Sequence, residues 1–176
     1  FGLPSIVTHC SNNYGPFQFP EKLIPLMILN AFNEDILPVY GDGNNVRDWI
    51  HVQDHCDALI SVIEKGKVGE RYNIGGNCEL KNIDVVNIIC EKFEQHRPRE
   101  NGESYKKLIS FVDDRPGHDY RYSINNDKIS HTLGWSPQIA FEDGIEKTIK
   151  WYLDQTSWWK TLVEKKYNLE RLGMKK

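Results

Sequence analysis

Short β-branched runs alternate with amphipathic stretches through most of the chain, and this alternation limits the fold more than any other feature of the sequence. The run Ser5–His9 places Ile, Val and Thr together, as a buried strand does. After Pro20 and Glu21 the apolar residues recur on one helical face, which predicts a helix. Strands that alternate with helices indicate an α/β fold. We expect strands at residues 5–9, 37–40, 47–52, 71–74 and 108–112, and helices from about residue 20, from residue 54, and over residues 82–95, 126–133 and 141–153.

The predicted strands are few and short, whereas helices dominate beyond residue 120. That balance fits a small lobe attached to a larger sheet better than it fits a complete doubly wound domain. We therefore divide the chain into one region, residues 1–156, and a tail, residues 157–176. The tail is expected to be helical and charged, because it mixes Lys with Glu after its Trp residues.

Composition excludes several classes of protein. Of the 176 residues, 39% are hydrophobic and 27% are charged, as in a globular protein with a core. The net charge of −3 leaves no basic excess for nucleic acid, and no apolar run reaches the roughly 18 residues of a membrane span. The four cysteines form no Cys-x-x-Cys pair, which argues against zinc and for reduced thiols in the cytoplasm. His51 and His55 fall in different predicted elements, so we expect no metal there.

Four polar segments carry side chains that a hydrophobic core would not select. Asn12 and Asn13 follow a predicted strand directly, at the place where α/β proteins bind ligands. An ordinary Asn-rich turn over residues 11–16 is the alternative. Arg47 follows a strand and a Gly-x-Gly turn, so its guanidinium could reach a diphosphate. A surface pair with Asp48 is the alternative.

The other two segments also allow two interpretations. Asn82 stands at a predicted helix start, and taken alone it fits a helix cap better than a ligand contact. Asp114–His118 sets an acid beside two potential cations in a run stiffened by Pro and Gly, so it could clamp an anion. A simple polar turn is the alternative for this segment.

The spacing of residues predicts no catalytic centre. The chain contains neither Gly-x-Gly-x-x-Gly nor Gly-x-x-Gly-x-x-Gly, so it lacks the turn that brings a helix N-terminus to a pyrophosphate. None of its eight tyrosines is followed four positions later by a lysine that would lower the pKa of the phenol. Our prediction of catalytic residues is therefore none.

Taken in order, these segments resemble the C-terminal half of the extended short-chain dehydrogenase/reductase family, and within it the dTDP-glucose 4,6-dehydratases. Asn-x-Tyr-Gly-Pro and Tyr-Asn-Ile-Gly are shared with many nucleotide-sugar epimerases. Pro-Glu-Lys-Leu-Ile-Pro at residues 20–25 and Asp-Arg-Pro-Gly-His at residues 114–118 are more specific to the dehydratases. The resemblance runs from Phe1 to about Leu153. It implies a substrate-binding lobe together with the last strands of an NAD-binding Rossmann domain whose N-terminal part is absent.

The resemblance also implies a role for each matching residue. Asn12 would contact the hexose-diphosphate side of the substrate, and Asn13 would contact the nicotinamide end of NAD. Arg47 would hold the diphosphate. The remaining implied substrate contacts are Lys22 and Leu23 along the nucleotide, Pro38, Val39 and Tyr40 around the base, Asn82 as a neighbouring polar contact, and Asp114, Arg115, Pro116, Gly117 and His118 closing over the nucleotide.

In the family, NAD oxidises the sugar of dTDP-glucose at C4, water leaves across C5 and C6, and the hydride returns to C6. The resemblance implies that the Tyr–Lys pair, the acidic pair of the elimination and the Gly-rich cofactor turn all precede Phe1. We therefore expect the isolated chain to be inactive and the full-length enzyme to be a homodimer. The alternatives are another nucleotide-sugar epimerase or decarboxylase, or a non-catalytic module that binds nucleotide sugars.

Overall fold

A computed structural model describes residues 2–166 of the chain. Strands and helices alternate in it, so the predicted α/β class is confirmed. In chain order the elements are β1 (Val7–Cys10), β2 (Asn12–Tyr14), α1 (Leu23–Asn33), β3 (Leu37–Tyr40), β4 (Val46–His51), α2 (Val52–Lys65), β5 (Arg71–Ile74), β6 (Glu79–Lys81), α3 (Asn82–His96), the 3₁₀ helix η1 (Tyr105–Leu108), β7 (Ile109–Val112), β8 (Arg121–Tyr122), α4 (Asp127–Leu133), α5 (Phe141–Asp154) and α6 (Thr156–Lys166).

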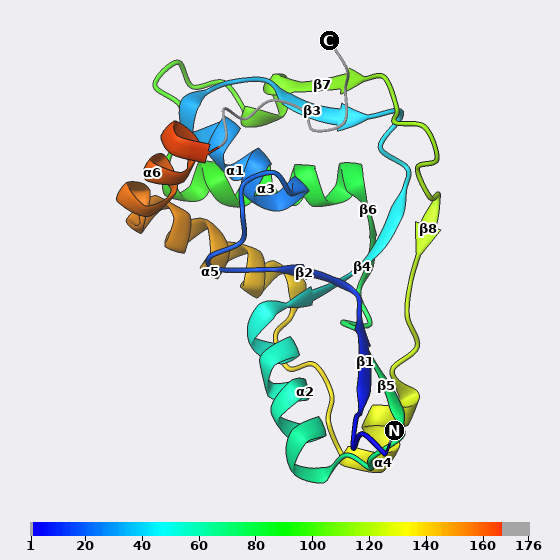
Figure 1. Ribbon diagram of the computed structural model, residues 1–176. Helices are drawn as coiled ribbons and strands as arrows, with labels where there is room; N and C mark the ends of the chain where they lie inside the picture. Colours follow the sequence, from blue (N-terminus) through cyan, green and yellow to red (C-terminus); the bar gives the residue numbers. More distant parts are fainter. Residues whose placement is uncertain (1, 167–176) are drawn as a thin grey trace.

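The elements form two lobes, which Figure 1 shows one above the other. The upper lobe holds α1, α3, α5 and α6, with β3 and β7 along its outer side. The lower lobe holds β1 and β5 with α2 and α4. Strand β4 runs from one lobe towards the other, so residues along this single strand reach both.

The strands form three small sheets. β1 pairs with β5 and β3 pairs with β7, while β4 is bonded to β2, β6 and β8. Among the described pairings only β4–β6 is antiparallel. The register of β2 sets Asn12 opposite Trp49, so the alternative of an Asn-rich turn over residues 11–16 is wrong at Asn12–Tyr14. Asn has little intrinsic preference for strands, but β4 offers a partner that local sequence does not reveal.

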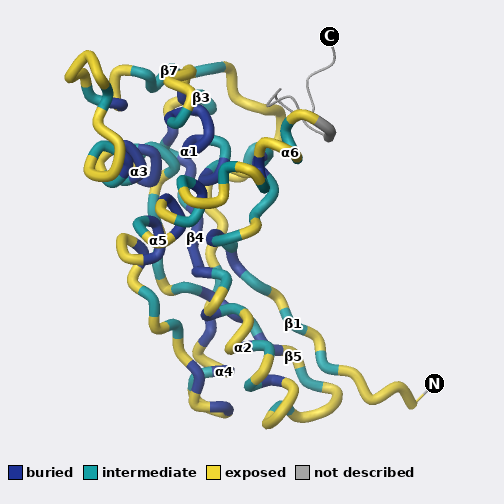
Figure 2. The backbone as a smooth tube through the Cα atoms, turned by 90° about the vertical axis from the view of Figure 1, so that its left-hand side faces the viewer, coloured by how far each residue is buried: buried dark blue, intermediate teal, exposed yellow. Residues whose placement is uncertain are grey.

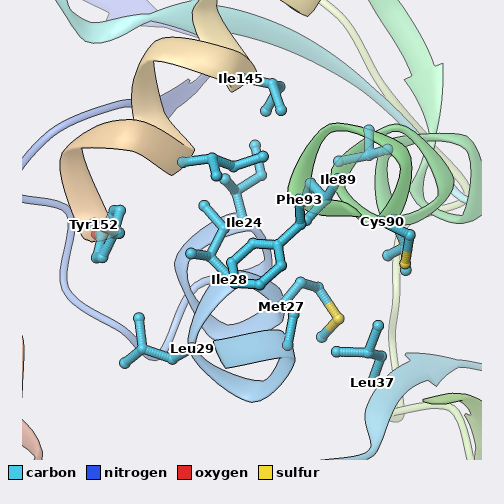
Figure 3. Packing of buried hydrophobic residues seen from close by; sticks show 14 of the residues in the cluster. Ile24, Met27, Ile28, Leu29, Leu37, Ile89, Cys90, Phe93, Ile145 and Tyr152 are labelled. Atoms are coloured by element: carbon cyan, nitrogen blue, oxygen red, sulfur yellow. The ribbon is translucent and has the colours of Figure 1, made fainter. Parts of the chain in front are cut away.

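The upper lobe has a continuous apolar core between α1, α3 and α5 (Figure 3). Ile24 and Ile28 of α1 face Phe93 of α3, and all three side chains are at most 1% exposed. Trp159 of α6 is also buried, and its indole Nε1 donates to the carbonyl of Tyr152 at 2.9 Å. The first part of the predicted tail therefore packs on this core, whereas residues 167–176 of that tail lie outside the described residues.

The lower lobe has a smaller core, made by residues of β4, α2, β5 and α4 and by Trp135. Its sheet has two strands, and β5 is the partner given for β1 among the described residues. Val7 of β1 is 43% exposed. Figure 2 shows β1 and the segment before it projecting from the body of the molecule, with much of their surface in solvent. Parallel strands are ordinarily covered on both faces, so this sheet is unusually open.

The start of α2 links the two lobes. The imidazole Nδ1 of His51 accepts a hydrogen bond from the backbone N–H of Gln53 at 3.2 Å and caps the helix. The helix predicted from residue 54 therefore begins at Val52, and the carboxylate of Asp54 accepts from the backbone N–H of Ile139 at 2.9 Å. Asp54 is 2% exposed and thereby fixes the segment that leads into α5.

Cys10, Cys56, Cys78 and Cys90 are free thiols. Within residues 2–166, no three His, Cys, Asp or Glu side chains are placed to hold a metal ion. None of the helices in this part of the chain combines the length and apolar character that crossing a bilayer requires.

Candidate functional site

The turn between β3 and β4, residues 41–45, lies beside Arg47, the start of α3 and the loop 113–119. We call this group the Arg47 cluster. Gly41 has φ +57, a conformation that favours glycine, and a Cβ at this position would lie 3.3 Å from a carboxylate oxygen of Asp114. The N–H of Gly41 donates to the carbonyl of Val112 at 2.8 Å, which extends the β3–β7 ladder. The loop that follows β7, residues 113–119, therefore starts beside the end of β3.

Arg47 lies at the centre of this cluster and is 8% exposed. Its Nη1 donates to the carbonyl of Val46 and its Nη2 to the carbonyl of Asp119, both at 2.7 Å. Burial lowers the pKa of Arg47, and the nearby positive charge of Arg115 lowers it further. Asp119 and Asp114 act in the opposite direction, so charges of both signs lie near this guanidinium.

The alternative of a surface pair between Arg47 and Asp48 is wrong. Asp48 is 1% exposed, and its carboxylate accepts from the backbone N–H groups of Gly76 at 3.0 Å and Cys78 at 2.8 Å. The guanidinium of Arg47 is instead oriented by backbone carbonyls. Because a guanidinium has five N–H donors, donors beyond these two bonds are left for a ligand.

The loop 113–119 is ordered by a side-chain bond across it. Nδ1 of His118 lies 2.7 Å from a carboxylate oxygen of Asp114, and the His118 side chain is only 5% exposed. This bond is the main reason that the pKa of Asp114 lies below its usual value. The His118 ring meets Tyr40 edge-on, with 6.3 Å between ring centroids. Arg115, Pro116 and Gly117 remain exposed between these anchors.

Asn82 is the first residue of α3, and the residue before it, Lys81, occupies the cap position without a side-chain cap bond. The interpretation of Asn82 as a helix cap is therefore wrong. Its backbone N–H donates to the carbonyl of Asn45 at 3.0 Å, which places the start of α3 against the turn before Arg47.

The three residues predicted around the base lie on two faces of β3. Val39 is 1% exposed and belongs to the core, so only its backbone can face a ligand. Pro38 and Tyr40 are half-buried on the opposite face. At the end of β3, the side chains that can face a ligand base are therefore the paired rings of Tyr40 and His118.

The second group of predicted residues lies at β2 and at the start of α1. Asn13 donates from Nδ2 to the carbonyl of Ser11 at 3.1 Å, and its Oδ1 lies 2.8 Å from Nδ1 of His55. Asn12 is half-buried beside it in β2, and Leu23 packs against the upper core. Lys22 is exposed and forms an ion pair with Glu21. The hydrogen bonds and the ion pair of this group join it to Ser11, Gln18, His55 and Glu21, which lie apart from Arg47 in the sequence.

Sequence reasoning missed three residues that hold the site in place. Asn45 and Asp119 orient the Arg47 cluster, and His55 contacts Asn13. His55 was considered only as a metal ligand. The polar run Asn44-Asn45 before Arg47 is a visible signal, but the partner of Asn45 is 74 positions away in the chain.

A shallow hollow of about 600 Å³ lies elsewhere, on the side of β4 that meets α4. Its carboxylates are already engaged: Glu79 is bonded to Arg121 and Ser123, and Asp48 is bonded to backbone N–H groups. None of the predicted site residues lines it. We therefore regard the Arg47 cluster as the better candidate for a ligand site.

Comparison with known proteins gives one consistent family. Residues 1–148 match the family model described as GDP-mannose 4,6 dehydratase. The chain is 53% identical over 173 residues to the dTDP-glucose 4,6-dehydratase of Xanthomonas campestris pv. campestris, covering 98% of this chain and 49% of that protein. It is 55% identical over 175 residues to the dTDP-glucose 4,6-dehydratase of Neisseria meningitidis serogroup B, with 98% and 49% covered.

Solved structures agree with this match. The crystal structure of the dTDP-glucose 4,6-dehydratase of Bacillus anthracis in complex with NAD superposes with a TM-score of 0.82 at 51% identity. The alignment covers 92% of this chain and 49% of that one. The chain thus spans about half the length of the curated relatives it matches.

Proposed function

Because the chain belongs to the GDP-mannose 4,6-dehydratase family, we propose that it forms the substrate-binding half of a dTDP-glucose 4,6-dehydratase. The complete enzyme would be an NAD-dependent lyase that converts dTDP-glucose to dTDP-4-keto-6-deoxyglucose and water. The observation that carries this proposal is the orientation of Arg47: a buried guanidinium, held by two carbonyls and with Arg115 nearby, in place of a carboxylate partner.

The proposed substrate contacts follow the two groups in the structure. Arg47 and Arg115 bind the diphosphate, and Asn82 adds a polar contact beside it. Tyr40 and His118, with Pro38 and the backbone of Val39, surround the base. Asp114, Pro116 and Gly117 complete the loop that closes over the nucleotide. Lys22 and Leu23 lie along the nucleotide, and Asn12 contacts the hexose-diphosphate side of the substrate.

NAD is the proposed cofactor, and Asn13 is the contact that this chain would provide. Its carboxamide is fixed at both ends, by Ser11 and by His55, so it presents one orientation to the nicotinamide. We propose that the hydride transfer and the proton transfers depend on groups outside the chain, and we assign no catalytic residue to it. The isolated chain should then bind nucleotide without turning it over.

A chimaera tests this proposal. Residues 1–176 would replace the matching half of the Neisseria meningitidis relative, so that a known N-terminal half supplies the rest of the enzyme. We expect the chimaera to convert dTDP-glucose, with the 4-keto product measured by its absorbance in alkali, and the chain alone to give only background. A folded chimaera that binds NAD yet produces no 4-keto sugar would contradict the proposal.

The same experiment separates the alternatives. An epimerase would return a hexose with inverted configuration and no loss of water, which the mass of the product reveals. A decarboxylase would require a uronic acid and release carbon dioxide. A non-catalytic binding module would leave dTDP-glucose unchanged even in the chimaera.

We further propose a cytoplasmic location and a homodimeric state for the complete protein. The four free thiols support the first, since reducing compartments keep cysteines unpaired. The family resemblance supports the second. Light scattering of the chimaera measures the mass of the assembly, and a monomeric mass would contradict the dimer.

A further inference from the structure

Asn45 connects three parts of the Arg47 cluster, although no ligand role is assigned to it. The residue is 6% exposed. Its Nδ2 donates to the carbonyl of Asp119 at 3.2 Å. That same carbonyl accepts from Nη2 of Arg47 at 2.7 Å. A single oxygen therefore receives the amide of Asn45 and the guanidinium of Arg47.

The backbone of Asn45 makes the third connection. Its carbonyl accepts from the N–H of Asn82 at 3.0 Å, and two residues earlier the carbonyl of Gly43 accepts from the N–H of Ile83 at 3.1 Å. The first turn of α3 is thus fixed against the turn that carries Asn45. The side chain and the backbone of one buried residue join β4, α3 and the end of the loop 113–119.

The loop 113–119 is held at both ends. Its first end continues from β7, where Val112 is paired with Tyr40 and accepts from Gly41. Its second end is Asp119, which the Nδ2 of Asn45 and the Nη2 of Arg47 hold together. The next residue is fixed as well, because the N–H of Val46 donates to the carbonyl of Tyr120 at 2.7 Å. Without the amide of Asn45, the carbonyl of Asp119 keeps the bond from Arg47 but loses the second donor that sets its direction.

We infer that Asn45 is a positioning residue for the diphosphate: it fixes Asp119 so that Arg47 is oriented before the ligand arrives. This inference rests on the proposed function, because it takes the Arg47 cluster as the diphosphate site. Fixing a charged side chain in advance reduces the ordering that binding must otherwise cost. Its effect should therefore depend on the phosphates of the ligand and not on the nucleoside.

The test compares thymidine diphosphate with thymidine as ligands of the chimaera and of its Asn45→Leu variant. Leu keeps the branching at Cγ and removes the donor. We expect about a tenfold loss of affinity for thymidine diphosphate, the effect of one hydrogen bond to a buried acceptor, and less than a twofold change for thymidine. Asn45→Gln, which restores an amide donor, should recover most of the loss.

Asn126→Leu is the matched control. Asn126 is 5% exposed and donates from Nδ2 to the carbonyl of Gly75 at 3.0 Å, so it makes the same kind of bond at the start of α4. We expect it to lower the unfolding temperature without a selective loss for the diphosphate. If Asn45→Leu does not fold, Asn45→Ala removes the same donor to Asp119 without adding a charge, and should lower affinity for the diphosphate selectively.

The outcomes separate the two proposals. Unchanged affinity of the Asn45 variants for thymidine diphosphate, or equal losses for both ligands, overturns the positioning role while the proposed function stands. Failure of the unmodified chimaera to bind thymidine diphosphate overturns the proposed function, and the positioning role with it.

Discussion

Arg47 is the residue whose replacement most directly tests the candidate site. Arg47→Lys keeps the positive charge but offers a point charge in place of a planar fork, and Lys cannot bond both carbonyls and a diphosphate in the same geometry. We expect affinity for thymidine diphosphate to fall about tenfold or more. Calorimetric titration of the chimaera measures it. A dissociation constant equal to that of the unmodified protein would exclude a diphosphate contact at Arg47.

His51 makes the stability of the chain depend on pH. Burial lowers its pKa below 6.5, and Lys147 lowers it further, while Asp54 acts in the opposite direction. Below pH 6.5 the unfolded chain therefore binds more protons at this position than the native chain does, so the free energy of unfolding falls as pH decreases through 6.5. Protonation also removes the Nδ1 acceptor that caps α2.

Urea unfolding between pH 5 and 8, with His51→Asn beside the unmodified chain, isolates this contribution. Asn retains a cap acceptor and does not titrate. The variant should be less stable at neutral pH, because it loses the edge contact with Tyr14, but its stability should change less with pH. Parallel curves for the two proteins would show that His51 does not titrate on unfolding.

At the scale of elements, sequence reasoning located most of the fold. β3 and β5 agree with the predicted ranges at both ends, and α3 and α5 agree to within one residue at each end. These elements carry a strong local signal, namely β-branched runs or apolar residues on one face. β6 and β8 were missed, because Glu79–Lys81 and Arg121–Tyr122 have little local signal and become strands through pairing with β4.

The candidate site likewise has a part that local sequence predicts and a part that only the fold creates. Arg47 and the loop 113–119 could be predicted, because an Arg after a Gly turn and an acid–cation run with Pro and Gly are visible in the sequence. The orienting bonds could not be predicted. They join Asn45 to Asp119 and Asp54 to Ile139, pairs separated by 74 and 85 positions, and only the folded chain places them together.

Gly76, in the segment between β5 and β6, lies directly against the backbone of β4. A Cβ at this position would lie 1.7 Å from the backbone carbonyl oxygen of Trp49, so no side chain fits without moving the backbone. We expect Gly76→Ala to lower the free energy of unfolding by at least about 3 kcal/mol. Gly102→Ala is the control, since a Cβ there meets nothing within 4 Å and adds only the strain of φ +69. Equal unfolding midpoints for the two variants would be inconsistent with this packing.

At the scale of the whole molecule, the lower lobe exposes apolar surface. Cys56, Ile60 and Ile63 form an exposed stripe on α2, and Ile63 is 81% exposed. We expect amide hydrogens of β1 and α2 to exchange rapidly in the chain alone and to become protected in the chimaera, because the N-terminal half would cover them. Hydrogen exchange followed by mass spectrometry measures this. Equal protection in both proteins would mean that these elements gain no neighbour.

The path of the chain between the lobes has a consequence for how this fold can change over evolution. From β1 the chain passes to the upper lobe, returns through β4 to α2 and β5, rises again to α3, and descends through β8 to α4 before it returns to the upper lobe in α5 and α6. Neither lobe is a continuous stretch of sequence. A recombination event inside this region therefore divides both lobes at once. We therefore expect single substitutions around Arg47 to disturb the fold less than the exchange of a continuous segment inside this region does.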